Sequence, residues 1–383
     1  MKFFYKRKDK QNPCAASTVQ TGECRHHPFY ELDRYTPLCT REDALYTALR
    51  EAVPVIDAAI YKLVRLTGGF TVQCSGKQAQ AELDSFLENV NVGGTQKGIH
   101  AFLSSYFEQM LTYGTAVGEM VTDSRGEICA LYNAELDCLE LERGKNPLDI
   151  RLCRRDAGAA VPLKAPGMIL LSVLNPAPGK LRGNSLLKGL PFVSSILLKI
   201  YNTIGVNWDR LGNLRFAVTY KPQNDVLDRA YAKDRAMEIA KQWGEAMKSG
   251  SQVSDFIAVG DVGIKVIGAD NQIMDSEVPV RQMLEQIVAK TGLPPFMLGL
   301  SWSTTERMSQ QQADILTSEL EAYRRILTPV IAKIAGTFLL LRGWRETPKV
   351  EWTDISLQDE VELSRARLYH AQAKQIEARL FQE

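Results

Sequence analysis

Carboxylates are the first residues in this sequence that could do chemistry, because paired acidic side chains can hold two divalent metal ions for nucleic-acid hydrolysis. The candidates are Glu135, Asp137, Glu140 and Glu142. Several of them stand at strand spacing beside apolar neighbours, which is the pattern of a sheet with one face in water. We therefore expect a solvated sheet face here, with a two-metal nuclease site as the alternative.

Cysteines and histidines near the start of the chain could be metal ligands. The set is Cys14, Cys24, His26, His27 and Cys39. The gaps of nine and fourteen residues between these cysteines match no usual zinc finger. None of the four histidines in the chain has a nucleophile or metal partner at a standard spacing. We expect no metal site and no cofactor.

Two further motifs could bind phosphate or carry a nucleophile. Residues 93–98, GGTQKG, place glycines and a lysine ahead of a helix, but they lack the spacing and the Lys-Ser/Thr pair of a phosphate-binding loop. We expect a loop with a helix cap. The sequence contains no G-x-S-x-G elbow, and Ser185 is better placed as a cap. Without a catalytic set, we expect no enzyme activity.

Basic and acidic residues are almost equal in number, with 46 Lys and Arg against 45 Asp and Glu. Proteins that grip nucleic acid tightly carry a basic excess, because each phosphate contact uses a cation. The balance argues against a tight nucleic-acid binder, and it fits most cytosolic proteins as well as a surface that DNA slides past. The hydrophobic share of 45% and the length of 383 residues predict two or three compact modules.

The seven cysteines are odd in number and irregularly spaced, which indicates reduced thiols and synthesis in a cytoplasm. The start of the chain has a basic run without an apolar segment behind it, so we expect no secretion. Residues 186–206 are the most apolar stretch, but they include two lysines and Pro191. Such groups are expensive in hydrocarbon, so we expect a buried or ring-packed helix and no membrane partner.

Apolar periodicity predicts the elements that position these residues. Residues 1 to about 40 have little periodicity and predict an arm that orders only on assembly. Thr40 and Asp43 predict the cap of a helix that Pro54 kinks or splits. The further expected elements are a strand at 70–74, helices at 82–90 and 98–113, a hairpin at 115–135, and strands at 136–142, 149–156 and 168–175.

The second half of the chain alternates long helices with short strands. We expect a long helix from the Asn184-Ser185 cap to about Leu211, and a helix from about Glu306 to Arg342 that Pro329 kinks. Its expected apolar face comprises Ile315, Leu316, Leu320, Tyr323, Leu327, Val330, Ile331, Ile334 and Phe338. Arg324, Arg325 and Lys333 on this helix are expected in water or, as the family resemblance given below implies, at a channel. The other expected elements are a strand at 215–222, a helix at 227–248, a hairpin of 255–260 with 263–268, a helix at 280–291, a strand at 349–354 and a final helix from about 358.

Four blocks, taken in order and at their spacing, resemble the portal proteins of tailed bacteriophages. They are YGTAVGEMVTDSRGEICALYNAE (113–135), the segment 182–222 that begins RGNSLLKGLPFV, FIAVGDVGIKVIG (256–268) and IVAKTGLPPFMLG (287–299) followed by the long QQQADILTSELEAYRRILTPVIAKI helix. The resemblance covers residues 99–341. No single block is specific, because Gly-x-Pro-Pro marks any helix stop.

The resemblance implies an α+β subunit with wing, stem, clip and crown regions, assembled as a ring of about twelve copies. The implied regions are an N-terminal arm (1–40), a wing (41–184), a stem helix (185–212), a clip (213–277), a second stem helix (278–298), a tunnel loop (299–307), a long kinked helix (308–345), and a wing strand with a C-terminal crown helix (346–383).

The resemblance also implies a site at the tunnel loop. Its candidate channel-lining residues are Trp302, Ser303, Thr304, Thr305 and Arg307, and the preceding helix stop comprises Gly292, Pro294, Pro295 and Gly299. The implied partners are double-stranded DNA in transit, the large terminase subunit, major capsid and scaffold proteins, and head-completion or tail adaptor proteins. The implied location is the capsid portal vertex of a virion. Another virion adaptor, a prophage remnant and a DNA-processing enzyme are the alternatives.

Overall fold

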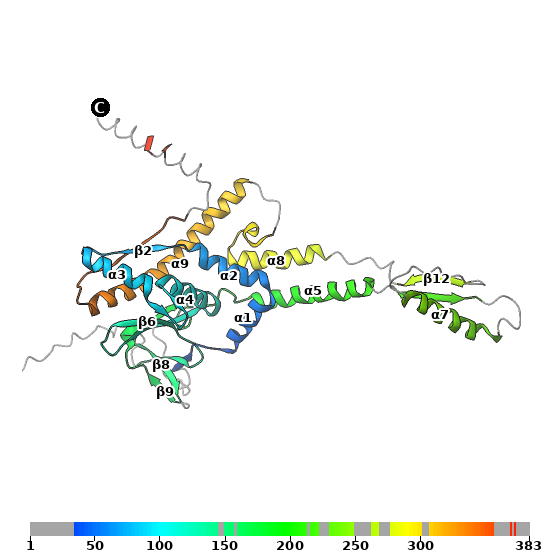
Figure 1. Ribbon diagram of the computed structural model, residues 1–383, viewed down its shortest axis with the longest axis horizontal. Helices are drawn as coiled ribbons and strands as arrows, with labels where there is room; N and C mark the ends of the chain where they lie inside the picture. Colours follow the sequence, from blue (N-terminus) through cyan, green and yellow to red (C-terminus); the bar gives the residue numbers. More distant parts are fainter. Residues whose placement is uncertain are drawn as a thin grey trace, which may run out of the picture. The chain divides into compact units, whose positions relative to one another are not determined.

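The computed structural model describes residues 34–144, 149–156, 159–212, 215–221, 230–248, 262–267, 276–300, 306–355, 368–369 and 371–372. The chain divides into two compact units, and Figure 1 gives the labels of their elements. The first unit combines Met1–Phe192 with Glu285–Glu383, and the second is Val193–Leu284. Helices and sheets both contribute, so the predicted α+β class is confirmed.

The helices of the first unit follow the predicted periodicity, although the helix expected at 82–90 begins earlier, at Lys77. The pattern that contains Pro54 is split into α1 (Arg41–Ala52) and α2 (Pro54–Leu66), because proline fits the first turn of a helix and not its interior. The backbone N–H of Thr40 donates to Asp43 Oδ2 at 2.8 Å, as the predicted cap requires. Helices α3 (Lys77–Asn89) and α4 (Ile99–Tyr113) follow.

A five-stranded sheet in the order β10-β5-β6-β3-β4 lies at the centre of this unit. The predicted hairpin is confirmed as β5 (Thr115–Thr122) and β6 (Ile128–Asn133), and β10 (Ile169–Val173) pairs with β5. Residues 93–98 belong to the short hairpin of β3 (Asn91–Val92) and β4 (Gln96–Lys97), and Gly98 caps α4. The predicted loop with a helix cap is therefore confirmed.

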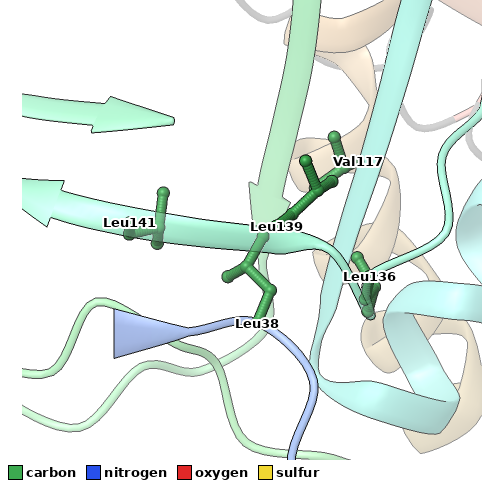
Figure 2. Packing of buried hydrophobic residues seen from close by; sticks show 5 residues of the cluster. All are labelled: Leu38, Val117, Leu136, Leu139 and Leu141. Atoms are coloured by element: carbon green, nitrogen blue, oxygen red, sulfur yellow. The ribbon is translucent and has the colours of Figure 1, made fainter. Parts of the chain in front are cut away.

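A four-stranded sheet contains β1 (Tyr35–Pro37), β7 (Leu139–Arg143), β8 (Ile150–Asp156) and β9 (Ala159–Pro162) in that order. Strand β1 corrects the expectation that the arm orders only on assembly, because its last residues already pair with β7 in the single chain. Leu38 follows β1 and packs with Val117, Leu136, Leu139 and Leu141, as Figure 2 shows. This cluster joins the two sheets.

The first unit is completed by C-terminal elements that return to its beginning. Strand β13 (Lys349–Trp352) pairs antiparallel with β2 (Phe70–Gln73), which confirms both predicted strands. Helix α9 (Glu306–Leu341) has the predicted bounds and contains Pro329. Its predicted apolar face is buried with one exception, since Ile315 is 63% exposed. Phe338 of α9 stacks on Phe86 of α3 with ring centres 4.1 Å apart.

The basic residues of α9 do not all lie where the sequence suggested. Arg324 is buried, donates from Nε to Thr67 O at 2.8 Å, and lies 5.0 Å from the Trp352 ring. Burial lowers the pKa of this guanidinium from its ordinary value. The expectation that Arg324 faces a channel or water was therefore wrong, because its long side chain crosses from α9 to the end of α2.

The second unit is small. Strands β11 (Arg215–Tyr220) and β12 (Val262–Ile267) form an antiparallel pair, and α7 (Ala232–Lys248) packs against β11. The predicted strand at 255–260 lies outside the described residues. Helix α8 (Glu277–Thr291) links the two units, and so does α5 (Leu190–Gly212).

Candidate functional site

The backbone ahead of α5 packs closely against the end of α4 and the end of β10. Gly114 ends α4 with φ of +78°, a left-handed conformation that glycine adopts without strain. A Cβ atom at Gly114 would lie 2.6 Å from the backbone of Asn184 and Ser185, and one at Gly183 would lie directly on the Gly114 carbonyl oxygen. Glycine at both positions therefore lets two backbone segments touch.

The end of β10 joins the same junction through hydrogen bonds. The backbone N–H of Leu174 donates to Gly114 O at 2.8 Å, and the N–H of Asn184 donates to Leu174 O at 2.7 Å. Asn175, which has φ of +43°, accepts from the side chain of Asn184 at 2.6 Å. Three distant stretches of sequence are thus fixed in one place by backbone groups.

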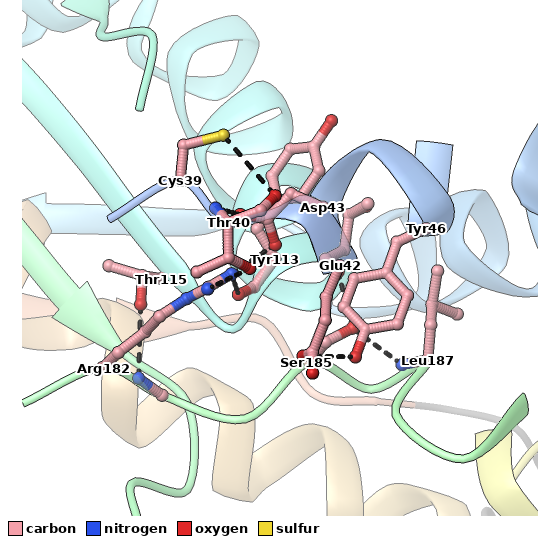
Figure 3. Close-up of polar contacts among 12 residues, drawn as sticks. Cys39, Thr40, Glu42, Asp43, Tyr46, Tyr113, Thr115, Arg182, Ser185 and Leu187 are labelled. Carbon is pink, nitrogen blue, oxygen red and sulfur yellow. Dashed lines mark hydrogen bonds and ion pairs between the residues drawn. The ribbon is translucent and has the colours of Figure 1, made fainter. Parts of the chain in front are cut away.

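Arg182 ties this junction to the start of α1. Figure 3 shows its guanidinium reaching Thr40 and Asp43. Nη1 donates to Thr40 Oγ1 at 2.7 Å, while Nη2 pairs with Asp43 and donates to Tyr113 O at 3.4 Å. The Asp43 side chain is only 5% exposed. A buried carboxylate needs a cation, so Arg182 is required by the burial of Asp43.

Ser185 acts as a cap, but the helix begins later than the sequence suggested. Its Oγ donates to Thr112 O at 2.6 Å and accepts from the N–H of Leu187 at 2.9 Å. The predicted start of the long helix at Ser185 was wrong, because α5 begins at Leu190. Gly189 has φ of +92°, which interrupts the turn after Ser185, and Pro191 fits the first turn of the helix that follows.

The predicted helix stop lies at the end of α8. The helix ends at Thr291, Gly292 takes a left-handed φ of +70°, and Pro294 precedes a 3-10 turn over Pro295–Leu298. Gly299 is again left-handed, with φ of +77°. The predicted channel residues Trp302, Ser303, Thr304 and Thr305 lie outside the described residues. Arg307 is exposed in the first turn of α9.

The acidic candidates do not form a solvated sheet face. Glu140 and Glu142 on β7 are buried, with 5% and 7% exposure. Arg34 donates two hydrogen bonds to Glu142, and Arg155 pairs with Glu140 at 3.2 Å. The expectation of a solvated face was wrong for these two residues, because neighbouring strands bring arginines to them. Their ion pairs also account for their charges without a metal.

Glu135 and Asp137 remain exposed at the rim of a cavity of about 460 Å³. Cys39 and Tyr113 also line this cavity. Within the described ranges, no group of three histidine, cysteine or acidic residues is placed to hold a metal ion. Of the five zinc candidates, only Cys39 lies in the described part of the chain. No helix among the described residues is long and apolar enough to span a bilayer.

The environments of two cysteines keep their thiols protonated. Burial and the carboxylate of Asp137 raise the pKa of Cys39 to about 12. Burial and the nearby carboxylate of Glu142 raise the pKa of Cys153 as well. Since the thiolate is the nucleophile, neither side chain is activated for attack at neutral pH.

Sequence reasoning identified Ser185 but missed Arg182 and the Gly114–Gly183 contact. The sequence did contain a signal for Gly114, because this glycine directly follows the apolar periodicity of α4 and is therefore typical of a C-cap. Nothing in the local sequence of Gly183 or Arg182 indicates their partners, which lie at least 68 residues away. Contacts of that range depend on the tertiary fold.

The sequence matches no protein-family model and no curated protein. Solved structures do match. A chain in "Virion of native gene transfer agent (GTA) particle" is 15% identical, with 86% of this chain and 89% of that chain aligned at a TM-score of 0.58. A chain in "Neck of native GTA particle computed with C12 symmetry" is 16% identical, with 85% and 88% aligned at a TM-score of 0.57. This chain has their fold.

A crystal structure described as an HK97 family phage portal protein from Corynebacterium diphtheriae also aligns, at 13% identity, 83% of this chain, 96% of that chain and a TM-score of 0.41. At 15% and 16% identity, the likeness to the GTA particle chains shows the fold alone. At the level of the fold, the resemblance predicted from the sequence is confirmed.

Gly183→Ala should destabilise the protein by at least about 2 kcal/mol, because the new methyl group has no space beside the Gly114 carbonyl. Urea unfolding followed by circular dichroism measures the change. Gly167→Ala is the matched control, since its Cβ would meet no atom within 4 Å, and it should shift the free energy of unfolding by less than about 0.5 kcal/mol. Equal effects of the two variants would contradict the close contact.

Cys39 and Cys153 should react with iodoacetamide at pH 8 more slowly than the exposed Cys129, by at least about tenfold. Their raised pKa values leave little thiolate at that pH. Peptide mass spectrometry of the folded protein resolves each site, and urea-unfolded protein is the control, in which the three cysteines should react at similar rates. Fast labelling of Cys39 in the folded protein would contradict the assigned environment.

Proposed function

We propose that this chain is a portal subunit of a tailed phage or a related particle. It forms a closed ring at one capsid vertex, and double-stranded DNA passes through the ring during packaging and ejection. The ring is a passive conduit and docking platform with no chemistry of its own. Its partners are the large terminase subunit, major capsid and scaffold proteins, and head-completion or tail adaptor proteins. The protein is made in the cytoplasm of the host and is located in the virion.

One observation carries this proposal: the chain shares its fold with chains of GTA particles over 85–86% of its length. The second of these structures is a particle neck computed with C12 symmetry. A cyclic neck assembly supports a ring of about twelve copies for a chain of the same fold. In this assignment α5 and α8 are the stem helices, residues 213–277 are the clip, and residues 299–307 are the tunnel loop.

Helix α5 offers a surface suited to a ring. Three of its apolar side chains, Leu198, Tyr201 and Trp208, are 38%, 44% and 64% exposed. Their spacing of three and seven residues puts them on one side of the helix. Exposed apolar stripes mark surfaces that other molecules cover. We assign this stripe to the contact between neighbouring copies, in which one patch meets a different patch.

The electrostatics support transit of DNA rather than a tight grip. The net charge is +1, and the buried arginines described above are used by acidic groups and backbone carbonyls of the same chain. The predicted loop offers neutral Trp302, Ser303, Thr304 and Thr305 with Arg307 beyond them. Such a lining contacts a phosphate backbone without the counterion release that makes binding tight.

The purified full-length protein should form rings with a central hole in electron micrographs. Trp208→Ser and Tyr201→Ser should each lower the ring fraction at least about threefold, because they remove apolar surface from the proposed contact. Native mass spectrometry measures that fraction. Leu45→Ser, which changes a 48% exposed leucine on α1, is the control and should leave it unchanged. A compact monomer under all conditions would contradict the ring itself.

Trp302→Ala and Arg307→Ala should leave rings intact but reduce DNA packaging or retention at least about tenfold, because both residues are assigned to the channel lining. The amount of nuclease-protected DNA per particle measures the effect. Arg154→Ala is the control, since this arginine is exposed and pairs with Asp156 on the wing sheet. If the rings collapse instead, the loop has a structural role.

A further inference from the structure

We propose that Arg182 couples the N-terminal segment Arg34–Thr40 to the start of α5. When this segment leaves its sheet, the backbone of residues 183–190 loosens, and loosening of that backbone releases the segment in turn. The two segments are far apart in sequence, but the Arg182 side chain connects them, because it contacts Thr40 and its backbone continues into residues 183–190. The inference concerns the first unit alone and does not depend on a ring.

At the N-terminal end, the segment is held by pairing, charge and packing. Strand β1 pairs with β7, and Leu38 donates from its N–H to Leu139 O at 2.9 Å. Arg34 donates to buried Glu142 from Nε at 2.9 Å and from Nη2. The Leu38 side chain is fully buried in the cluster of Figure 2. Any movement of the segment therefore exposes apolar surface and leaves the buried Glu142 carboxylate without its hydrogen bonds from Arg34.

In the middle, Thr40 and Asp43 present two oxygens to one guanidinium. The N–H of Thr40 donates to Asp43 Oδ2 at 2.8 Å, and Arg182 contacts Thr40 Oγ1 and Asp43 Oδ1. The Nε of Arg182 has no hydrogen-bond partner among the described residues. The two terminal nitrogens of this side chain donate to Thr40, Asp43 and Tyr113. If Thr40 shifts, the geometry of the whole group changes.

At the other end, Gly183 leaves the backbone no freedom to absorb such a shift. It is in contact with Gly114 O, and its N–H donates to Thr115 Oγ1 at 3.3 Å. Backbone N–H groups after Gly183 also donate hydrogen bonds. Leu186 donates to Leu111 O at 3.0 Å, and Leu190 donates to Leu187 O at 3.0 Å. These amides precede or begin α5, so they report how firmly its start is held.

Amide hydrogen exchange of the full-length protein tests the coupling in both directions, because a coupling free energy is reciprocal. Arg182→Gln should speed exchange at Leu186 and Leu190 and also at Leu38, at least about fivefold at each. Leu38→Ala should speed exchange at Leu38 and also at Leu186 and Leu190. In the double variant, the combined effect on Leu186 should be clearly smaller than the product of the two single effects.

Arg154→Gln provides the matched control, because this exposed arginine lies on β8 of the same sheet and should change none of the three amides. If Arg182→Gln lowers folding too far, Thr40→Val replaces it, since it removes the acceptor of the Nη1 contact and keeps the shape of the side chain, although it also removes the capping acceptor of the Asp43 N–H. The proposal is overturned if Arg182→Gln or Thr40→Val speeds exchange at Leu186 but leaves Leu38 unchanged. It is equally overturned if the two single effects multiply in full.

Discussion

A backbone contact between two glycines is the constraint on which the first unit depends. Gly114 ends α4 and Gly183 precedes α5, and no side chain fits between them. The carbonyl of Gly114 also accepts from Leu174 at the end of β10. The helix, the sheet and the start of α5 therefore share one fixed point. Side chains can repack around a mutation, but a backbone carbonyl that accepts a hydrogen bond from Leu174 and touches Gly183 has little room to move.

Buried ion pairs in the same unit make distant segments depend on one another. Asp43, Glu140 and Glu142 are buried carboxylates, and each is matched by an arginine from another element. Such pairs add little net stability compared with apolar packing, but the loss of one partner is costly because it leaves a buried charge. They therefore specify which segments belong together. Strand β1 is an example, since only three residues pair but Arg34 and Leu38 fix its place.

Much of the fold could be predicted from the sequence, because apolar periodicity reports directly on helices and strands. Helix α9 and the hairpin of β5 and β6 have the expected bounds within a few residues. Strands β1 and β3 were missed because two or three residues carry no period, and β9 was missed because its sequence AAVP does not alternate between apolar and polar residues. The start of α5 was misjudged because Ser185 caps a turn that Gly189 interrupts. The partners of Arg182 and Arg324 depend on tertiary contacts, which no local pattern encodes.

The positions of basic side chains on α9 relate the fold to the charge balance of the sequence. A long helix with basic residues could in principle offer them to DNA phosphates, and Arg324 on α9 was such a candidate. Instead its guanidinium stacks on Trp352 and donates to Thr67 O, while Lys333 donates to Ile169 O. Burial lowers the pKa of both groups, and for Arg324 it outweighs the opposite effect of the nearby carboxylates of Glu321 and Asp354. Arg324 is thereby withdrawn from the surface, whereas the Lys333 side chain stays exposed. With 46 basic and 45 acidic residues, the chain has no basic excess with which to bind phosphates tightly, and this balance suits the proposed passage for DNA.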